Sequence, residues 1–312
     1  MIKKEDPIFL TGHNGLVGSA ILRKLKKKNF KKIIIADRNN LDLLDQRKVN
    51  KFILENKPKA IIIAAAKVGG INANNIYRGE FIYENLQIQN NLIHSAYLNG
   101  IKNLIFLGSS CVYPKKSKQP IKEKYLLTSA LEKTNEPYAI AKIAGIKLCE
   151  SYNDQYKTNY ICLMPCNTYG PNDNYDYETS HFLPALIRKI YEAKKFKKKK
   201  FVLWGTGKPL RECIYVDDLA DACVYFLNKK VNHYLINIGS DIEMSIKSYA
   251  HVIKKLLNYE GKIVFDKTKP DGTYRKKQDL SISKKYGWKA KTTLVDGLKL
   301  SIDDFKKNIF KN

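Results

Sequence analysis

The sequence predicts an α/β protein built on a doubly wound parallel sheet, with a smaller, sequence-discontinuous α/β part. Two observations indicate this. Short apolar, β-branched runs alternate with longer amphipathic segments through the first half of the chain, and this pattern changes after Tyr169. Apolar strands that alternate with helices are typical of a parallel sheet covered on both faces. Right-handed crossovers then place helices on both sides of the sheet.

The elements of the first half follow in order along the chain. Apolar, β-branched runs predict the strands Ile8–Thr11, Lys32–Ala36, Ala60–Ala64, Asn103–Leu107 and Tyr160–Met164. Amphipathic periodicity predicts the helices Leu16–Lys27, Gln46–Asn56, Phe81–Asn99 and Tyr138–Tyr156. The turn residues of segment 170–173 then mark a break in the pattern.

The second half predicts further strands and helices, and a return of the chain to the first sheet near residues 213–239. The expected strands are Phe201–Trp204, Cys213–Val216, Leu235–Ile238 and Lys262–Phe265, and the expected helices include His181–Tyr191 and Asp217–Leu227. We therefore expect one domain from residues 1–170 plus about 213–239. The second would contain about 171–212 plus 240–312.

Composition is that of a globular protein, with 44% hydrophobic and 28% charged residues. Six cysteines occur without a CxxC pair, which argues against a disulfide framework or a metal site. The short charged segment 1–6 is followed by an apolar run too brief for a signal peptide, and no stretch is long enough to span a bilayer. We expect a cytoplasmic protein with no membrane partner.

The charge balance is unusual, because 56 Lys+Arg against 30 Asp+Glu give a formal charge of +26. Nucleic-acid binding is one interpretation, since basic stripes neutralise phosphates. However, lysine is spread along the whole chain, which favours a solvated, lysine-rich surface. A third interpretation is a positive field that gathers small anionic ligands. We expect no nucleic-acid partner.

A glycine-rich turn follows the first predicted strand and opens the first helix. Gly12, Gly15 and Gly18 give the spacing Gly-x-x-Gly-x-x-Gly. Such glycines let the backbone approach a pyrophosphate, whose charge lies at the helix N-terminus. The second strand ends at Asp37 and Arg38, where an acid favours the ribose hydroxyls of NAD and an arginine favours the 2′-phosphate of NADP. These two residues therefore leave the choice between NAD and NADP open.

A candidate catalytic set lies farther along the chain. Ser109 follows the fourth strand, at the sheet edge where ligands bind, and Tyr138 and Lys142 share one face of a helix. A free tyrosine holds its proton until pH ~10. A neighbouring ammonium would favour the phenolate and bring proton transfer nearer to neutral pH.

With the glycine turn, Ser109, Tyr138 and Lys142 resemble the extended short-chain dehydrogenase/reductase family, whose triad is Ser, Tyr and Lys on a Rossmann fold. The segments 64–71, 108–114, 135–145, 202–207 and 269–273 are similar, more closely, to the GDP-L-fucose synthase branch of that family. The matches run from about residue 8 to 290.

This resemblance implies a two-stage reaction on GDP-4-keto-6-deoxy-D-mannose, with epimerisation at C3 and C5 followed by NADPH-dependent reduction at C4. Cys111 and His181 match the branch's acid–base pair, with the thiol as the base. Ser109 and Tyr138 would hold the C4 oxygen. Asn14 stands where relatives can carry arginine, and Asp37 replaces a smaller neutral residue. NADPH is the expected cofactor, with NAD as the alternative.

The resemblance also implies contacts to both ligands and a homodimer formed through the two long helices. Substrate contacts are expected at Lys189, Trp204, Arg211 and Asp271. Cofactor contacts are expected at Gly12, Asn14, Gly15, Leu16, Val17, Gly18, Asp37, Arg38, Leu107, Gly108, Ser109, Lys142, Pro165, Asn167, Thr168 and His181.

Two alternatives remain at this stage. One is a related enzyme that acts on another 4-keto deoxy nucleotide sugar, such as a colitose-type synthase or a plain 4-epimerase. Cys111 with His181 argues against a plain 4-epimerase, because simple inversion at C4 needs no second acid–base pair. The other is a non-catalytic binding protein on the same scaffold, which the intact Ser109, Tyr138 and Lys142 argue against.

Overall fold

The computed structural model describes residues 1–269, 271 and 273–310. Its main sheet has six parallel strands in the order β2-β1-β3-β4-β5-β9, which confirms the predicted doubly wound fold. The strands are β1 (Ile8–Thr11), β2 (Ile33–Ile34), β3 (Ala60–Ile63), β4 (Asn103–Leu107), β5 (Asn159–Pro165) and β9 (Leu235–Ile238). Only β2 is much shorter than predicted.

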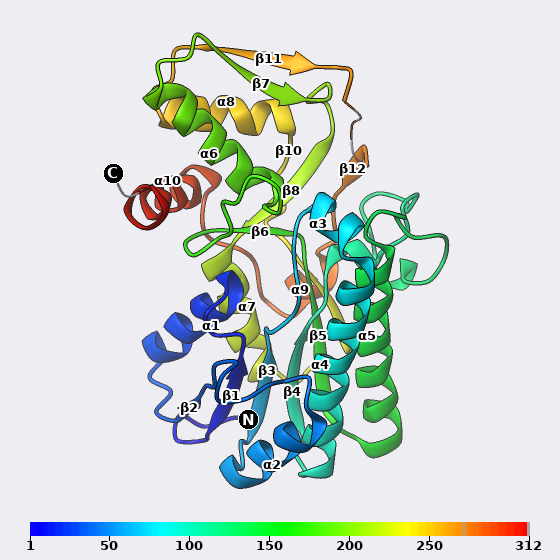
Figure 1. The fold of residues 1–312 in the computed structure, drawn as a ribbon. Helices are drawn as coiled ribbons and strands as arrows, with labels where there is room; N and C mark the ends of the chain where they lie inside the picture. The colour runs from blue at the N-terminus through cyan, green and yellow to red at the C-terminus, as the bar shows by residue number, and fades with distance from the viewer. Residues whose placement is uncertain (270, 272, 311–312) are drawn as a thin grey trace.

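Helices cover both faces of this sheet (Figure 1). Helices α1 (Leu16–Lys27) and α7 (Val216–Leu227) bury Ile21 and Leu219 in the core on one face. The opposite face is covered by α2 (Gln46–Asn56), α4 (Arg78–Leu98) and α5 (Glu136–Tyr156), the last two packed side by side. No helix of the described chain is long and apolar enough to cross a membrane.

The strand order reverses between β1 and β3, because the chain passes outward to β2 and then returns across β1. At such a reversal, the connections leave the sheet in opposite directions and open a crevice at the carboxyl ends of the strands. The glycine turn follows β1, and Ser109 comes two residues after the end of β4. Pro165 is the last residue of β5. The fold thus gathers segments that are far apart in sequence at one edge.

A smaller α/β part lies beyond that edge, in the upper half of Figure 1. One sheet contains β6 (Asn167–Tyr169), β8 (Leu210–Tyr215), β10 (Glu243–Ser245) and β12 (Arg275–Lys276), and a two-stranded sheet pairs β7 (Lys200–Trp204) with β11 (Lys262–Asp266). Helices α6 (Phe182–Lys195), α8 (Ile246–Leu256) and α10 (Leu294–Asp304) supply its core. Two short helices, α3 (Ile71–Ile76) and α9 (Ser281–Lys285), lie nearer to the main sheet.

One expectation about connectivity was wrong. The strand predicted at Cys213–Val216 is present as β8, but it pairs with β6, β10 and β12 rather than with the main sheet. Within residues 213–239, α7 and β9 alone return to the main sheet. An apolar run has the same local pattern in either sheet, so its pairing could not be read from sequence.

A fully buried amide, Asn237 in the middle of β9, joins the main sheet to two other segments. Its backbone N–H donates to Glu123 Oε1 at 2.9 Å, and its side-chain nitrogen donates to the Ile121 carbonyl at 2.9 Å. Its side-chain oxygen accepts bonds from Tyr113 at 2.6 Å and from Gln278 at 3.1 Å. Buried polar groups need such partners, and the Tyr113 hydroxyl has no other hydrogen bond among the described residues.

We expect Asn237→Leu to lower the free energy of unfolding by about 3 kcal/mol, because it leaves the buried Tyr113 hydroxyl and one N–H of Gln278 without a hydrogen bond. Urea unfolding at equilibrium would measure the loss. The control is Asn232→Leu, at an exposed asparagine whose backbone N–H, not its side chain, bonds to Tyr286. A similar loss in both variants would contradict this role for Asn237.

Candidate active site

The glycine turn forms an open helix N-terminus. Gly15 is the N-cap residue of α1 and no side chain caps the helix, so the N–H groups of its first turn are available to a ligand. Gly12 adopts φ +69°, and a Cβ at Gly18 would come within 1.9 Å of the Gly12 carbonyl oxygen. Only glycine therefore permits this close turn. The arrangement fits the diphosphate of a dinucleotide.

His13, inside the same turn, adds a group that the sequence interpretation did not use. Its Nδ1 is buried and has no hydrogen-bond partner among the described residues. The Asn14 carbonyl accepts a bond from Asn172 Nδ2 at 2.8 Å, so a segment of the smaller part contacts the turn. An unpartnered buried nitrogen beside free backbone N–H groups is consistent with an anion-binding turn.

The structure distinguishes the two residues at the end of β2. Asp37 Oδ1 accepts the backbone N–H groups of Asn39 and Asn40, each at 3.0 Å, and so closes the turn after the strand. Arg38 is exposed, and no ion pair engages it within the described part of the chain. The guanidinium is therefore free to meet a 2′-phosphate, whereas one carboxylate oxygen of Asp37 is already committed to the backbone.

The remaining expected cofactor residues lie at the carboxyl ends of β4 and β5. Gly108 follows Leu107 and donates its N–H to the Leu163 carbonyl at 2.9 Å. A Cβ at Gly108 would come within 2.3 Å of the Met164 sulfur, so the strands approach closely here. Pro165 ends β5, while Asn167 and Thr168 open β6 directly after it. Leu16 and Val17 begin α1.

Ser109, Tyr138 and Lys142 come together between β4 and α5. Ser109 lies close enough to Tyr138 to lower the pKa of its hydroxyl. The buried Lys142 Nζ donates to the Leu107 carbonyl at 2.9 Å and lies 5.9 Å from the centre of the Tyr138 ring. Residues four apart on a helix share a face, so α5 presents both side chains to the end of β4.

The expected direction for the Tyr138 pKa was wrong in this structure. Burial raises its pKa above the usual 10, the nearby Cys111 raises it further, and only the hydrogen bond with Ser109 lowers it. Removal of solvent disfavours the charged phenolate. Lys142 bonds to a backbone carbonyl instead, so Tyr138 keeps its proton and is suited to donate it.

Burial also lowers the pKa of Lys142, from 10.5 to about 8. The ammonium is still the main form at neutral pH, but its charge is lost as the pH rises through about 8. A buried ammonium that titrates so near to neutrality is typical of a functional site.

Cys111 lies beside this group. It is half-buried, its N–H donates to Ser109 Oγ at 3.2 Å, and it starts the turn after Ser109. Its thiolate charge would raise the pKa values of both Tyr138 and Arg211, which places it near both side chains. The charge of Cys111 thus acts on Tyr138 of the main domain and on Arg211 of the smaller part.

His181 reaches the crevice from the smaller part, as the N-cap residue of α6. Its side chain is exposed, yet the surrounding protein lowers its pKa below the usual 6.5 through loss of solvation. Both observations fit a residue on the wall of a concave site, where solvent reaches the ring from one side only. The neighbouring loop carries Gly69, whose missing Cβ would lie 3.3 Å from Phe81, and Phe81 packs on the Tyr138 ring.

The expected substrate residues form a second group. Trp204 is 66% exposed, with the ammonium of Lys189 5.4 Å from its ring centre and that of Lys269 at 5.5 Å. Arg211 is held by the carbonyls of Leu210 and Thr273, each at 2.7 Å from Nη1. An exposed ring flanked by cations can stack on a base while the cations meet phosphates.

Asp271 faces Thr206, which donates its N–H to Oδ1 at 2.9 Å and its hydroxyl to Oδ2 at 2.6 Å. Its charge also raises the pKa of Arg211, against the larger lowering by burial, so the two side chains are neighbours. Arg211 thus connects the substrate group to Cys111.

Two more residues belong to the site region and were missed from sequence. Asn135, the N-cap residue of α5, is buried, and its Oδ1 has no partner among the described residues. It precedes Tyr138 by one helical turn and can offer a hydrogen bond to a ligand. Lys269 was not expected beside Trp204, because only the folded loop brings it there.

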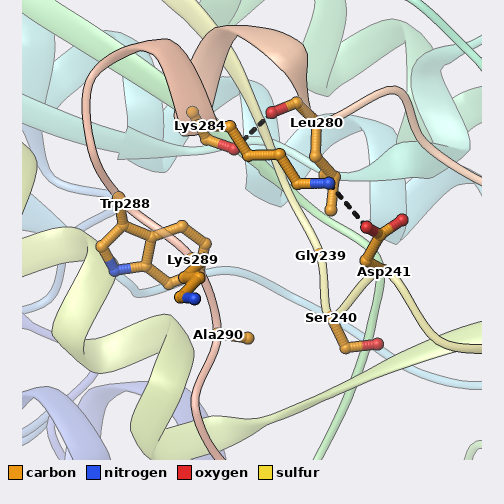
Figure 2. A pocket seen from close by; sticks show the side chains of 9 residues that line it. Gly239, Ser240, Asp241, Leu280, Lys284, Trp288, Lys289 and Ala290 are labelled. Atoms are coloured by element: carbon orange, nitrogen blue, oxygen red, sulfur yellow. Dashed lines mark hydrogen bonds and ion pairs between the residues drawn. The ribbon is translucent and has the colours of Figure 1, made fainter.

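A separate cavity of about 320 Å³ lies behind β9, between the turn at Gly239–Asp241 and the segment from Leu280 to Ala290. Figure 2 shows Lys284 bonded to Asp241 at its rim and Trp288 along one wall. None of the expected site residues lines it. The titratable groups that the sequence analysis named converge instead around Tyr138, at the end of β4 and the start of α5.

Fold and site together define a dinucleotide-dependent oxidoreductase of the Ser–Tyr–Lys type. The family model "NAD dependent epimerase/dehydratase family" matches residues 8–239, and the chain belongs to this family. It is 52% identical to GDP-L-fucose synthase 1 of Arabidopsis thaliana over 99% of this chain and 96% of that protein.

Solved structures agree with this membership. A GDP-L-fucose synthetase from Naegleria fowleri, crystallised with NADP, superposes with a TM-score of 0.91 at 29% identity and covers 100% of this chain and 96% of its own. A GDP-6-OMe-4-keto-L-xylo-heptose reductase from C. jejuni gives a TM-score of 0.91 at 38% identity, over 98% and 99% of the two chains.

We expect the reductase rate to fall as the pH rises through about 8, because Lys142 then loses its charge. A profile of kcat/KM against pH measures this fall. Lys142→Arg keeps its charge at pH 8 and should move the fall to higher pH, whereas Lys142→Met has no charge to lose and its profile should lack the fall. An unchanged fall in Lys142→Arg would assign it to another group.

The same shift has a stability consequence of opposite sign. The folded pKa of Lys142 lies below its unfolded value of 10.5, so the unfolded chain binds more protons between pH 8 and 10.5. The contribution of Lys142 to the free energy of unfolding therefore increases over that window.

Proposed function

We propose that this protein converts GDP-4-keto-6-deoxy-D-mannose into GDP-L-fucose. It first inverts C3 and C5 and then reduces the C4 ketone with NADPH. The observation that carries the proposal is the position of Cys111, which follows Ser109 by two residues, donates its N–H to Ser109 Oγ at 3.2 Å and, when charged, would raise the pKa of Tyr138. A simple reductase or 4-epimerase has no use for a further proton-moving group there.

Epimerisation begins with the acidity of protons next to the C4 ketone. The thiolate of Cys111 removes the proton from C3, and the electron pair moves onto the C4 oxygen. Ser109 and Tyr138 donate hydrogen bonds to that oxygen and stabilise its negative charge. His181, on the smaller part, returns a proton to the opposite face of the carbon. Once Cys111 has given up that proton to solvent and His181 has taken one, the same sequence at C5 completes the inversion.

Reduction uses the same oxygen contacts. The nicotinamide supplies the hydride when the cofactor is bound. Tyr138, whose pKa burial has raised, gives its proton to the C4 oxygen as negative charge develops there. Lys142 holds the ribose beside the nicotinamide, and its bond to the Leu107 carbonyl fixes the ammonium in place. The glycine turn holds the diphosphate.

The remaining assignments follow from the second group of residues. Trp204 stacks on the guanine, Lys189 and Arg211 meet the diphosphate of the sugar nucleotide, and Asp271 orients the loop through Thr206. In this arrangement the main sheet carries the cofactor and the smaller part carries the substrate. We also place the protein in the cytoplasm, because all six cysteines are free.

The proposal is tested by incubation with GDP-4-keto-6-deoxy-D-mannose and either NADPH or NADH. We expect NADPH oxidation and a product inverted at C3 and C5. Cys111→Ser should lower inversion by about 10²-fold or more, with a smaller loss of C4 reduction. Absorbance at the nicotinamide band and the stereochemistry of the product measure the two steps.

Two outcomes would contradict the proposal. Absence of oxidation with either cofactor excludes this reaction, and equal loss of both steps in Cys111→Ser removes the assigned role of the thiol. A second candidate substrate is a 4-keto GDP-heptose, favoured by the 38% identity to the heptose reductase. Reduction of a GDP-heptose without inversion would select it.

We further propose a homodimer formed through α4 and α5. These helices pack side by side, and apolar side chains remain exposed on them, including Tyr83 at 62% and Ile140 at 43%. Large exposed apolar side chains on adjacent helices are typical of an interface. A two-fold pairing would bury both sets in one four-helix contact.

We expect the double variant Tyr83→Glu/Ile140→Glu to be a monomer, because the pairing would bury charges without partners. Sedimentation equilibrium gives the mass. Leu54→Glu on α2, at a leucine that is 57% exposed, is the matched control and should stay dimeric. A wild-type monomer would refute the dimer directly.

A further inference from the structure

The segment that leads to His181 is anchored at two points on the cofactor-binding half. We name residues 172–181 the strap. At its start, Asn172 Nδ2 donates to the Asn14 carbonyl in the glycine turn at 2.8 Å. Near its end, the Thr179 carbonyl accepts the N–H of Gly70 at 2.7 Å. The strap thus runs from the glycine turn to the loop after β3.

The end of the strap is stiff. Asp176 Oδ1 accepts bonds from the N–H groups of Glu178 at 3.0 Å and Thr179 at 2.9 Å, and from the Thr179 hydroxyl at 2.8 Å. Asn174 Nδ2 also donates to that hydroxyl at 3.0 Å. Because these bonds tie Thr179 to the strap on several sides, a displacement at residues 179–180 carries over to His181.

Gly70 packs directly against this stiff end. A Cβ built at Gly70 would lie 2.5 Å from the Ser180 carbonyl oxygen and 3.1 Å from that of Thr179. Such approaches are shorter than a carbon–oxygen contact allows, so any side chain must push the strap away. Gly70 has φ −64°, which any L-residue adopts freely. The need for glycine is therefore one of space and not of backbone conformation.

The loop that carries Gly70 is fixed in place by hydrogen bonds to buried amide side chains, so the strap and not the loop has to move. Asn74 Nδ2 donates to the carbonyls of Gly69 at 2.8 Å and Gly70 at 3.0 Å. Asn85 accepts the Lys67 N–H at 3.1 Å and donates to its carbonyl at 3.0 Å. Asn74 and Asn85 are 6% and 2% exposed. The loop therefore acts as a fixed surface for the strap.

We infer that Gly70 is a positioning residue, and that the space left by its missing side chain sets the place of His181 opposite Cys111. The inference rests on the proposed function, since it concerns the proton that His181 returns. Inversion needs the imidazole and the thiol on opposite faces of one carbon. Cys111 and Tyr138 are held by β4 and α5 and do not depend on the strap.

The test is Gly70→Ala in the full-length protein, with Gly79→Ala as matched control. A Cβ at Gly79 meets nothing within 4 Å. We expect inversion at C3 and C5 to fall at least about tenfold relative to hydride transfer in Gly70→Ala, since a misplacement of about 1 Å can cost about 10²-fold. The reduced product shifts toward sugars that are not inverted. Gly79→Ala should behave as the wild type.

A second readout does not use activity. The imidazole NMR signal of His181, assigned with His181→Asn, should move in Gly70→Ala and stay unchanged in Gly79→Ala. If Gly70→Ala does not fold, Asn74→Ala releases the same loop without adding a side chain, and the same lower ratio and moved signal are expected.

An unchanged ratio with an unmoved His181 signal in Gly70→Ala would overturn the inference. So would an equal fall of inversion and hydride transfer, which marks a structural role only. Absence of inversion in the wild-type protein is a different result, because it refutes the proposed function whatever Gly70→Ala does. The NMR comparison still decides the position of His181 in that case.

Discussion

The arrangement of the site depends on how closely α5 lies against β4. The Lys142 ammonium bonds to the Leu107 carbonyl, and Gly145 lets the helix approach, since a Cβ there would come within 2.6 Å of Phe106. A longer separation would take Tyr138 away from Ser109 and leave a buried charge without a partner. One short contact between helix and strand therefore fixes Tyr138 near Ser109 and the Lys142 ammonium together.

Burial then sets the protonation states. The same loss of solvent raises the pKa of Tyr138 and lowers those of Lys142 and His181, because it always disfavours the charged form. A protonated tyrosine, a cation that titrates near neutrality and an imidazolium that gives up its proton more readily result from a single physical cause. Their separate roles come from the elements that carry them: α5 for the first two, and the strap for His181.

Local pattern predicted much of this structure. The bounds of β1, β4, β9, α1 and α2 agree with their apolar runs, because each buries a regular stripe. Strand pairing was harder to predict from sequence, as β8 shows, because the residues of a strand do not indicate which strand it pairs with. The pKa of Lys142 and the space at Gly70 were also beyond reach. Both depend on atoms from distant segments, at Leu107 and at Thr179 and Ser180.

Cys111 differs from the other cysteines, which are all buried while it is half-exposed. The most accessible thiol of a protein is also the sulfur that peroxide reaches first. Oxidation to the sulfenic acid would remove the thiolate that we propose as the base for inversion and leave Tyr138 and Lys142 intact. The protein would then keep a reductase without its epimerase, so the stereochemistry of the sugar it releases would report the redox state around it.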